Sequence, residues 1–287
     1  MEKLSYKIAN HILTLSGSGI TAAMAQIYGF DAFLTDTPEK EWEIRFEKKR
    51  SAPVFRTFSK FNFGDINCSF GKTDGSRYVF SMQSRESECP ELQMEYTAGE
   101  NTMHAYGFGD SSMLRFALWS AFNLFAIPCN MFAIHSSVIV YDNKANLFLG
   151  ESGTGKSTHT RLWLKNFPQA QLLNDDSPIV AVENGRFMAY GSPWSGKTHC
   201  YHNAGFPINA FVRLKQAPQN TIARLNRIQS FIALQPSCPP AMSKDSFYSE
   251  KIIGILDLAI RQIPVYGLSC LPDDDAAILA NSTLYNI

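Results

Sequence analysis

A glycine-rich pattern of the form G-x-x-x-x-G-K-[ST], which cradles nucleotide phosphates in many proteins, occurs twice in this chain. The first copy is Gly150-Glu151-Ser152-Gly153-Thr154-Gly155-Lys156-Ser157, and the second is Gly191-Ser192-Pro193-Trp194-Ser195-Gly196-Lys197-Thr198. Around the first copy, residues 145–149 read as a buried strand and residues 156–166 as a helix. A phosphate-binding loop requires this order of strand, loop and helix, so the first copy predicts a nucleotide site.

The residue types of the first copy suit phosphate binding. Glycines allow successive backbone N–H groups to turn inward around phosphate oxygens, and the helix N-terminus adds a partial positive charge. The Lys156 ammonium is predicted to reach the β- and γ-phosphates, and the Ser157 hydroxyl is predicted to bind Mg²⁺. We therefore predict that ATP, or another phosphoryl donor, is bound by the following residues: Gly150, Ser152, Gly153, Thr154, Gly155, Lys156, Ser157 and Thr158.

The second copy lacks this context, because Pro193 and Trp194 occupy its loop and the following segment, 199–207, is broken by glycine and proline. It is therefore not predicted to be a second nucleotide site. Two interpretations stay open for it. One is a surface turn around a packed tryptophan, and the other is a loop that delivers Lys197 to a phosphate or an anionic substrate.

Two adjacent acids, Asp175 and Asp176, follow the apolar segment 171–174. An apolar strand that ends in acids downstream of the loop lysine is typical of a carboxylate that holds Mg²⁺ beside the phosphates. Two carboxylates can also divide the work, since one supports the metal while the other accepts a proton from an incoming hydroxyl. A solvated turn is the structural alternative for this pair.

His135 lies in the apolar segment 132–141, where a lone histidine is usually a satisfied core group. A hairpin at residues 142–144 would pair this strand with residues 145–149, which lead into the first glycine motif. That arrangement predicts that His135 lies near the sheet end that carries the acids, where its imidazole orients or tunes a carboxylate.

The chain changes character near residue 108. Before it, short alternating or aromatic-rich segments predict a β-rich region over 1–108, with strands at 8–15, 42–48, 54–58, 67–70, 78–83 and 92–96. Strands and helices then alternate, which predicts an α/β domain over 109–287. Its predicted helices cover 111–126, 156–166 and 247–262, with a last helix after Pro272, and its predicted strands cover 132–141, 145–149, 171–174, 178–182, 187–190, 210–214 and 265–270.

The composition argues against two broad classes of protein, although a local basic patch stays possible. Lys and Arg number 26 and Asp and Glu also number 26, while hydrophobic residues make up 45% of the 287 residues. A disordered chain would have low hydrophobicity and high net charge, and a nucleic-acid-binding protein would show a basic surplus. The cysteines form no C-x-x-C pair and follow no secretory signal, which favours free thiols and a cytoplasmic protein.

One stretch, residues 116–134, has the length of a membrane span and no charged side chain. Asn123, Pro128 and Asn130 interrupt it, and Pro128 is expected to stop a helix near Ile127. We therefore predict a buried helix followed by a strand, and no membrane partner.

Three segments together resemble the HPr kinase/phosphorylase and phosphoenolpyruvate carboxykinase superfamily: His135-Ser136-Ser137, the first glycine motif with Thr158, and Asp175-Asp176. The resemblance covers about residues 130–200 and implies an α/β fold with a mixed sheet curled towards a barrel and helices packed outside it. It also implies that His135 partners Asp175 as the general base, while Asp176 and Ser157 support Mg²⁺. The spacing allows the two aspartates to exchange these roles.

The chain departs from HPr kinases in one region. Those enzymes carry an E-I-R-G-x-G-type segment with an arginine used in phosphoryl transfer, whereas the comparable region here is 191–197. We expect a small HPr-kinase-like phosphotransferase that uses Mg²⁺ and a nucleotide to phosphorylate a hydroxyl of a protein, peptide or small molecule. Its expected catalytic residues are Asp175, His135, Lys156 and Lys197. A carboxykinase-type enzyme, a nucleotide-gated regulatory protein with little catalysis, and a homo-oligomer stay open.

Overall fold

The computed structural model describes residues 2–37, 41–48, 53–75, 77–88, 91–196 and 198–285. Their contacts form two compact units: Met1–Cys129 with Ala241–Ser249, and Asn130–Pro240 with Glu250–Ile287. The helix expected at 111–126 therefore belongs to the first unit. The domain boundary near residue 108 stays a prediction.

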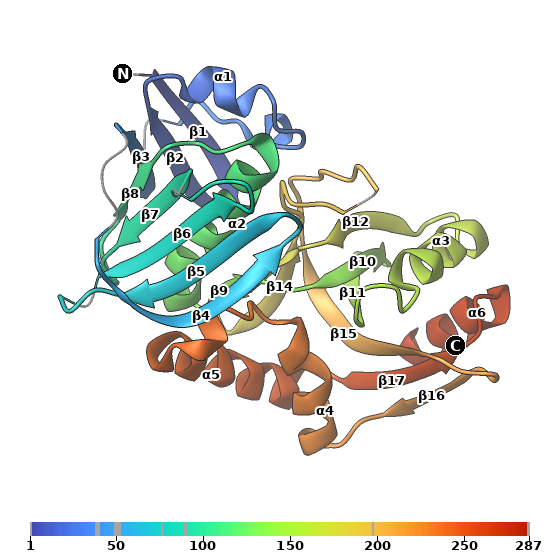
Figure 1. The fold of residues 1–287 in the computed structure, drawn as a ribbon. Helices are drawn as coiled ribbons and strands as arrows, with labels where there is room; N and C mark the ends of the chain where they lie inside the picture. Colours follow the sequence, from blue (N-terminus) through green and yellow to red (C-terminus); the bar gives the residue numbers. More distant parts are fainter. Residues whose placement is uncertain are drawn as a thin grey trace. The chain divides into compact units, whose positions relative to one another are not determined.

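An eight-stranded mixed sheet forms the first unit, in the order β1-β2-β3-β8-β7-β6-β5-β4 (Figure 1). β3 pairs in parallel with both of its neighbours, and the remaining pairs are antiparallel. The strands are β1 (Glu2–Ile8), β2 (His11–Gly17), β3 (Trp42–Glu47), β4 (Arg56–Phe63), β5 (Ile66–Lys72), β6 (Tyr78–Ser84), β7 (Leu92–Tyr96) and β8 (Thr102–Tyr106). Two short helices, α1 (Ile20–Met24) and η1 (Asp31–Phe33), lie between β2 and β3 in the sequence.

One strand predicted in this unit is wrong. Segment 8–15 crosses a turn at Ala9 and Asn10, whose φ angles are +47° and +65°, and so belongs to two antiparallel strands. The turn has no glycine or proline to mark it, and asparagine tolerates this left-handed backbone better than most residues. β1 and β8 have no counterpart among the predicted strands.

The apolar helix predicted at 111–126 is α2 (Ser111–Ala126), which continues as η2 (Ile127–Cys129). Asp110 caps it by accepting a hydrogen bond from the Met113 N–H. The helix packs on the sheet through stacked rings, with Phe125 on Trp42 and Phe116 on Phe63. Among the described residues, Ser111–Cys129 is the one helical stretch long and apolar enough to cross a membrane, but 67% of its most apolar window is buried inside the protein. Burial in the core accounts for its composition.

A nine-stranded mixed sheet forms the second unit, with the path β12-β10-β11-β15-β14-β13-β9 and with β17 between β15 and β16. The strands are β9 (Met131–Ala133), β10 (Ser136–Tyr141), β11 (Lys144–Leu149), β12 (Gln171–Asp176), β13 (Ile179–Glu183), β14 (Arg186–Tyr190), β15 (Gly205–Gln216), β16 (Thr221–Arg224) and β17 (Val265–Cys270). The strand predicted at 132–141 is interrupted at Ile134 and His135, so its two parts join different regions of the sheet.

The connection between β12 and β13 shows that this sheet is curled. Four strands lie between them in the sheet order, so in a flat sheet they would be about 24 Å apart. Only Ser177 and Pro178 connect them along the chain, and such a link spans about 11 Å at most. The sheet therefore bends back on itself as a half-barrel, which confirms the predicted mixed, curled sheet.

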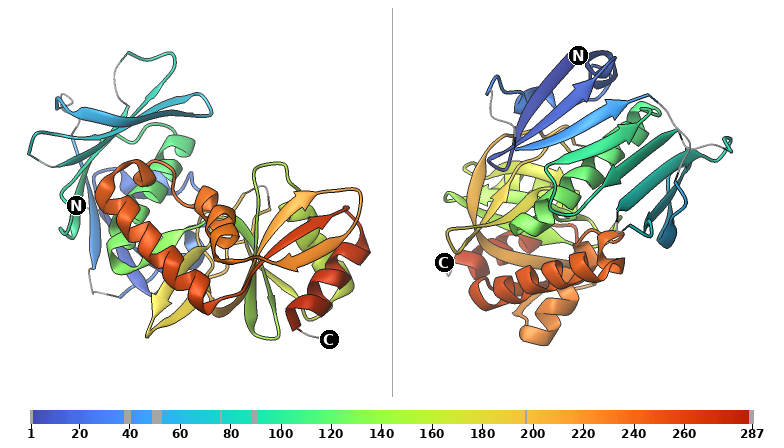
Figure 2. Two further views of the ribbon diagram at one scale, coloured as in Figure 1. Left: turned by 90° about the horizontal axis from the view of Figure 1, so that it is seen from below. Right: turned by 90° about the vertical axis from the view of Figure 1, so that its left-hand side faces the viewer.

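Helices cover this sheet. α3 (Lys156–Asn166) and α6 (Asp274–Tyr285) lie side by side, as Figures 1 and 2 show, and bury Trp163, Phe148 and Val212 between helix and sheet. The second unit also contains α4 (Arg227–Leu234), η3 (Gln235–Ser237) and most of α5 (Ser246–Gln262), whereas η4 (Met242–Lys244) belongs to the first unit. α4 and β16 have no counterpart in the sequence prediction, whereas α3 has its predicted bounds.

His159 on α3 gives this unit a pH-dependent stability. The Trp163 indole N–H donates to His159 Nε2 over 3.1 Å, the ring lies edge-on to Phe148, and burial lowers the pKa of His159 from 6.5 to about 4. Between these values the unfolded chain binds a proton that the folded chain excludes, so stability falls as the pH falls from 6.5 towards 4.

We expect the free energy of unfolding to fall by about 2 kcal/mol between pH 7 and pH 5 through His159 alone. The His159→Phe variant keeps a packed ring but cannot titrate, so its loss over the same interval should be smaller than that of the wild type by this amount. Urea unfolding at both pH values measures the difference. Equal losses in the two proteins would contradict the buried, neutral imidazole.

Candidate active site

The first glycine motif forms the turn between β11 and α3, so the predicted strand, loop and helix are all present. We call residues 150–157 the glycine loop. Gly153 and Gly155 have φ angles of +84° and +99°, which other residues rarely adopt. The Thr154 N–H and hydroxyl both donate to the Glu151 carbonyl, over 3.2 and 2.8 Å. Ser152 is exposed at the tip of the loop, and Thr158 is half-buried on the first turn of α3.

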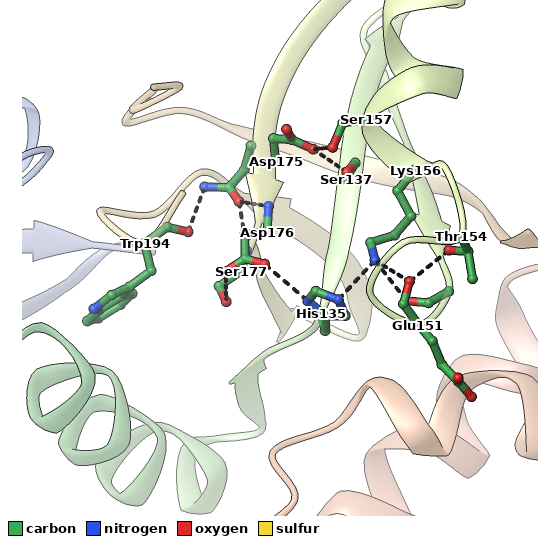
Figure 3. Close-up of polar contacts among 12 residues, drawn as sticks. His135, Ser137, Glu151, Thr154, Lys156, Ser157, Asp175, Asp176, Ser177 and Trp194 are labelled. Atoms are coloured by element: carbon green, nitrogen blue, oxygen red, sulfur yellow. Dashed lines mark hydrogen bonds and ion pairs between the residues drawn. The ribbon is translucent and has the colours of Figure 1, made fainter. Parts of the chain in front are cut away.

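Lys156, His135 and Asp176 form a continuous chain of polar contacts (Figure 3). The Lys156 ammonium donates to His135 Nε2 over 2.9 Å, and to the carbonyl oxygens of Gly150 and Glu151 over 2.8 and 3.2 Å. Because Nε2 accepts this bond, the imidazole proton is on Nδ1, which lies 3.2 Å from Asp176 Oδ1. His135 therefore connects the loop lysine to one aspartate.

The other aspartate contacts the loop serine. Asp175 Oδ1 accepts hydrogen bonds from the Ser157 hydroxyl, over 3.0 Å, and from the Ser137 hydroxyl. Asp175 is 5% exposed, whereas the Asp176 side chain is 41% exposed. The pairing thus differs from the one that the resemblance implied, in which His135 partners Asp175 and Ser157 shares the metal with Asp176.

The strand register explains this pairing. β10 and β12 are antiparallel neighbours, and Ser137 lies directly opposite Asp175. Opposite residues point to the same face, so the Ser137 hydroxyl meets the Asp175 carboxylate. His135 precedes β10, where its backbone N–H donates to Ser237 O over 2.8 Å instead of joining the sheet, and its ring meets Asp176.

The second glycine motif packs against the acids. Trp194 is 3% exposed, as the packed-tryptophan interpretation requires, and the Gly196 N–H donates to the Asp175 carbonyl over 3.0 Å. A Cβ on Gly191 would lie 1.8 Å from the His202 carbonyl oxygen, so this glycine is needed for close packing rather than for phosphate. Lys197 lies outside the described residues, and its delivery to an anion stays a prediction.

An amide network fixes the backbone around the acid pair. The Asn174 carboxamide oxygen accepts hydrogen bonds from the N–H groups of Asp176 and Ser177, over 3.1 and 2.9 Å. Its amide nitrogen donates to Ser192 and to the Trp194 carbonyl. The second motif therefore packs against the end of β12 and stabilises the backbone that carries the two carboxylates.

Burial lowers the pKa of the Lys156 ammonium below its ordinary value, while Asp176 and Asp175 oppose this effect. The nearby Arg213 guanidinium lowers the pKa further because it is a like charge. Arg213 extends from β15 and contacts the Ser237 hydroxyl, over 3.3 Å, and the exposed Glu151 carboxylate, over 3.9 Å. The site thus gathers two cations beside two carboxylates.

Sequence reasoning gave no role to Ser137 or Arg213. Ser137 stands within a quoted motif, but its partner depends on the strand register. Arg213 had a visible signal, because it is a charged residue inside the apolar strand segment 210–214. Charged side chains are rare within apolar strands, and Arg213 is half-buried, which marks it as a functional candidate.

The ligands available for a metal are few. Among the described residues, no group of three or more His, Cys, Asp or Glu side chains is placed to hold a metal ion. Asp175 and Ser157 supply one carboxylate and one hydroxyl in contact with each other. Mg²⁺ is commonly held by one or two carboxylates together with substrate phosphates and water, so these two residues fit it.

No protein-family model matches the chain, and no curated protein matches it. Among solved structures, the chain is similar to the HPr(Ser) kinase/phosphatase from Coxiella burnetii, with a TM-score of 0.34 and 12% sequence identity. The alignment covers 54% of this chain and 88% of that chain. Neither fold nor function follows from a likeness at this level, so the function is argued from the site itself.

Proposed function

We propose that this protein is a Mg²⁺-dependent phosphotransferase that moves the γ-phosphoryl group of a bound nucleotide to a hydroxyl. The observation that carries the proposal is the joined set of contacts at the start of α3. One chain runs from Lys156 through His135 to Asp176, and a second contact joins Ser157 to Asp175. These contacts support the proposal because phosphoryl transfer needs a phosphate-binding loop, a metal carboxylate and a proton acceptor close together.

The phosphates bind at the glycine loop in this proposal. The first N–H groups of α3 lack helical partners, and the helix dipole favours an anion there. Lys156 already points its ammonium across the loop, where it contacts two loop carbonyls. Phosphate oxygens replace these contacts when the nucleotide binds, and Arg213 adds positive charge nearby.

Asp175 and Ser157 would hold Mg²⁺. The ion, when bound, neutralises charge on the phosphates and fixes their orientation. The Ser137 hydroxyl restrains the Asp175 carboxylate from the sheet side and so keeps its position. The proposal therefore assigns the metal to Asp175 rather than to Asp176. The residue spacing had left both assignments open.

Asp176 is the general base in this proposal. Its carboxylate is partly exposed to an incoming hydroxyl, and its Oδ2 accepts only a long hydrogen bond from the Ser177 hydroxyl, over 3.4 Å. The Asp175 carboxylate is buried and is held by the Ser137 and Ser157 hydroxyls.

The acceptor hydroxyl gives its proton to Asp176 as its oxygen attacks the γ-phosphorus. The bond between that phosphorus and the β–γ bridging oxygen breaks, and the nucleoside diphosphate leaves. His135 donates from Nδ1 to Asp176 and orients it, and Lys156 fixes the imidazole tautomer.

The test is transfer of label from [γ-³²P]ATP, with Mg²⁺, into two separate acceptor pools. One pool contains serine and threonine peptides, and the other contains small hydroxylated metabolites. Label that enters either pool supports the kinase and gives the acceptor class. Tight ATP binding with no label in either pool and only trace hydrolysis would overturn the proposal in favour of a nucleotide-gated binding protein.

A further inference from the structure

A cavity of about 320 Å³ lies in the first unit, on the face of the eight-stranded sheet opposite to the one that α2 covers. Phe125 of α2 stacks on Trp42 and lies edge-on to Tyr96, so these two rings mark the covered face. Side chains alternate between the faces of a strand, and Glu47 and Glu95, which line the cavity, are an odd number of positions from those rings. The volume is near the lower end of the range for ligand pockets, which suits a molecule of amino-acid size.

Charged groups of both signs line this cavity. Glu47, Glu95 and Glu100 contribute three carboxylates, and Arg77 and His104 contribute one guanidinium and one imidazole. The carboxylates outnumber the bases even when His104 is protonated, so the lining carries a net negative charge. It therefore complements a ligand that has more ammonium than carboxylate groups, and the guanidinium is a partner for that ligand's own carboxylate.

Glu95 holds the guanidinium in a defined orientation. Glu95 is 2% exposed, and its carboxylate accepts hydrogen bonds from Arg77 Nη1, over 2.8 Å, and from the Gln93 amide, over 2.9 Å. A buried carboxylate needs such partners. The Arg77 side chain is half-exposed, and its guanidinium has five N–H donors, so it is able to bind a second carboxylate from the cavity side.

Glu47 presents an accessible negative charge at a second fixed position. His104 Nδ1 lies 2.6 Å from Glu47 Oε1, and the imidazole is the donor because a carboxylate only accepts. Both side chains are partly exposed, so the Glu47 carboxylate is open to a ligand as well as bound to His104.

The strand register sets the distance between the two ion pairs. His104 on β8 lies directly opposite Glu95 on β7, so the pairs are on neighbouring strands, about 5 Å apart. Glu47 extends from β3, on the other side of β8, which adds up to one further strand spacing. The guanidinium of Arg77 and the Glu47 carboxylate are therefore about 5–10 Å apart. An extended lysine separates its side-chain ammonium from its carboxylate by a distance in this range.

Glu100 adds a carboxylate on the Arg77 side of the cavity. It lies in the turn between β7 and β8 and lines the same cavity as Arg77. Arg77 is close to this turn, because it precedes β6, whose first residue Tyr78 lies opposite Tyr96 at the end of β7. An α-amino acid carries its carboxylate and its ammonium on one carbon, so neighbouring positive and negative partners suit it.

We infer that this cavity binds a basic amino acid such as lysine. Arg77 binds the α-carboxylate, Glu100 binds the α-ammonium, and Glu47 binds the side-chain ammonium. The inference goes beyond the proposed function, because the residues that line this cavity belong neither to the glycine loop nor to the acid pair. It holds whether or not the chain transfers phosphate.

Calorimetric titration of the full chain with lysine, cadaverine and norleucine tests this inference. Cadaverine is lysine without the carboxylate, and norleucine is lysine without the side-chain ammonium. We expect lysine to bind at least about tenfold more tightly than either analogue, because each analogue leaves one charged group of the cavity unpaired. An affinity for lysine that matches that for either analogue, or no detectable binding of lysine, would overturn the inference.

The Glu47→Gln variant tests the contact with the side-chain ammonium. The amide keeps the shape of the carboxylate but not its charge, so lysine should bind at least about tenfold more weakly while norleucine stays within about twofold of its wild-type affinity. Glu86→Gln is the matched control, because Glu86 is exposed in the same unit and does not line the cavity, and it should change neither affinity. If Glu47→Gln weakens both ligands equally, or neither, the assignment is wrong.

A peptide mimic separates a free amino acid from a lysine within a polypeptide. Nα-acetyl-lysine N-methylamide has the side-chain ammonium but neither a carboxylate nor an α-ammonium. We expect it to bind at least about tenfold more weakly than lysine, since Arg77 and Glu100 then lack their partners. An affinity equal to that of lysine would assign the cavity to a peptide side chain and contradict the amino-acid site.

Discussion

The Asp176→Asn variant is expected to lower kcat for phosphoryl transfer by about 10²–10⁴-fold, the usual effect of losing a general base. The amide has nearly the shape of the carboxylate but cannot accept the proton of the acceptor hydroxyl. In the proposed site the nucleotide would contact the loop and Lys156 rather than Asp176, so its affinity should stay within about twofold of the wild type. Initial rates with saturating ATP, together with calorimetric ATP binding, measure the two quantities.

Asp275→Asn is a matched control, because this aspartate is exposed on α6 and belongs to no part of the site. It should leave kcat unchanged. If Asp176→Asn keeps wild-type kcat, or lowers kcat only by weakening ATP, then Asp176 is not the base. The proposed assignment, with Asp176 as the base and Asp175 as the metal ligand, would then be wrong.

The Asp175→Asn variant is expected to raise the Mg²⁺ concentration for half-maximal rate by about tenfold or more, in line with the loss of one ligand or its support. At saturating Mg²⁺ part of the rate should return, because the proton acceptor is still present. The physical reason is the contact of Asp175 with Ser157, the predicted metal hydroxyl. A Mg²⁺ titration of the rate in the wild type and the variant measures the shift.

The two aspartate variants are each other's best controls. Asp176→Asn should lower kcat without moving the Mg²⁺ midpoint, and Asp175→Asn should move the midpoint. The reverse pattern would return the base to Asp175 and the metal to Asp176, as the family resemblance implied. Chelation of Mg²⁺ by EDTA should stop transfer in both variants and in the wild type.

The sequence was sufficient to predict a helix or a loop wherever one local signal in the sequence was strong. α2 and α3 have their predicted bounds because long apolar or strongly patterned segments end at clear capping or stop signals, such as Asp110 and Pro128. The glycine loop was predictable because its glycines need backbone angles that other residues avoid. The turn at residues 9–10 was missed because no glycine or proline marks it.

The sequence singled out the loop, the histidine and the acid pair of the candidate site, but it did not predict which of these side chains contact one another. In an uninterrupted strand His135 and Ser137 would point to one face, and both would meet Asp175. The chain instead leaves the sheet at His135, whose N–H bonds to Ser237, a residue about one hundred positions away. A long-range contact of this kind redirects the ring to Asp176 and leaves no local trace in the sequence.

The central claim is that the glycine loop and the acid pair carry out phosphoryl transfer. It is tested most directly by the rate at which γ-³²P leaves ATP, to an acceptor or to water, in the wild type and in Lys156→Ala. We expect Mg²⁺-dependent release by the wild type and a rate about 10²–10³-fold lower in the variant, because Lys156 no longer stabilises the phosphate charge. Equal rates in two folded proteins would contradict the account.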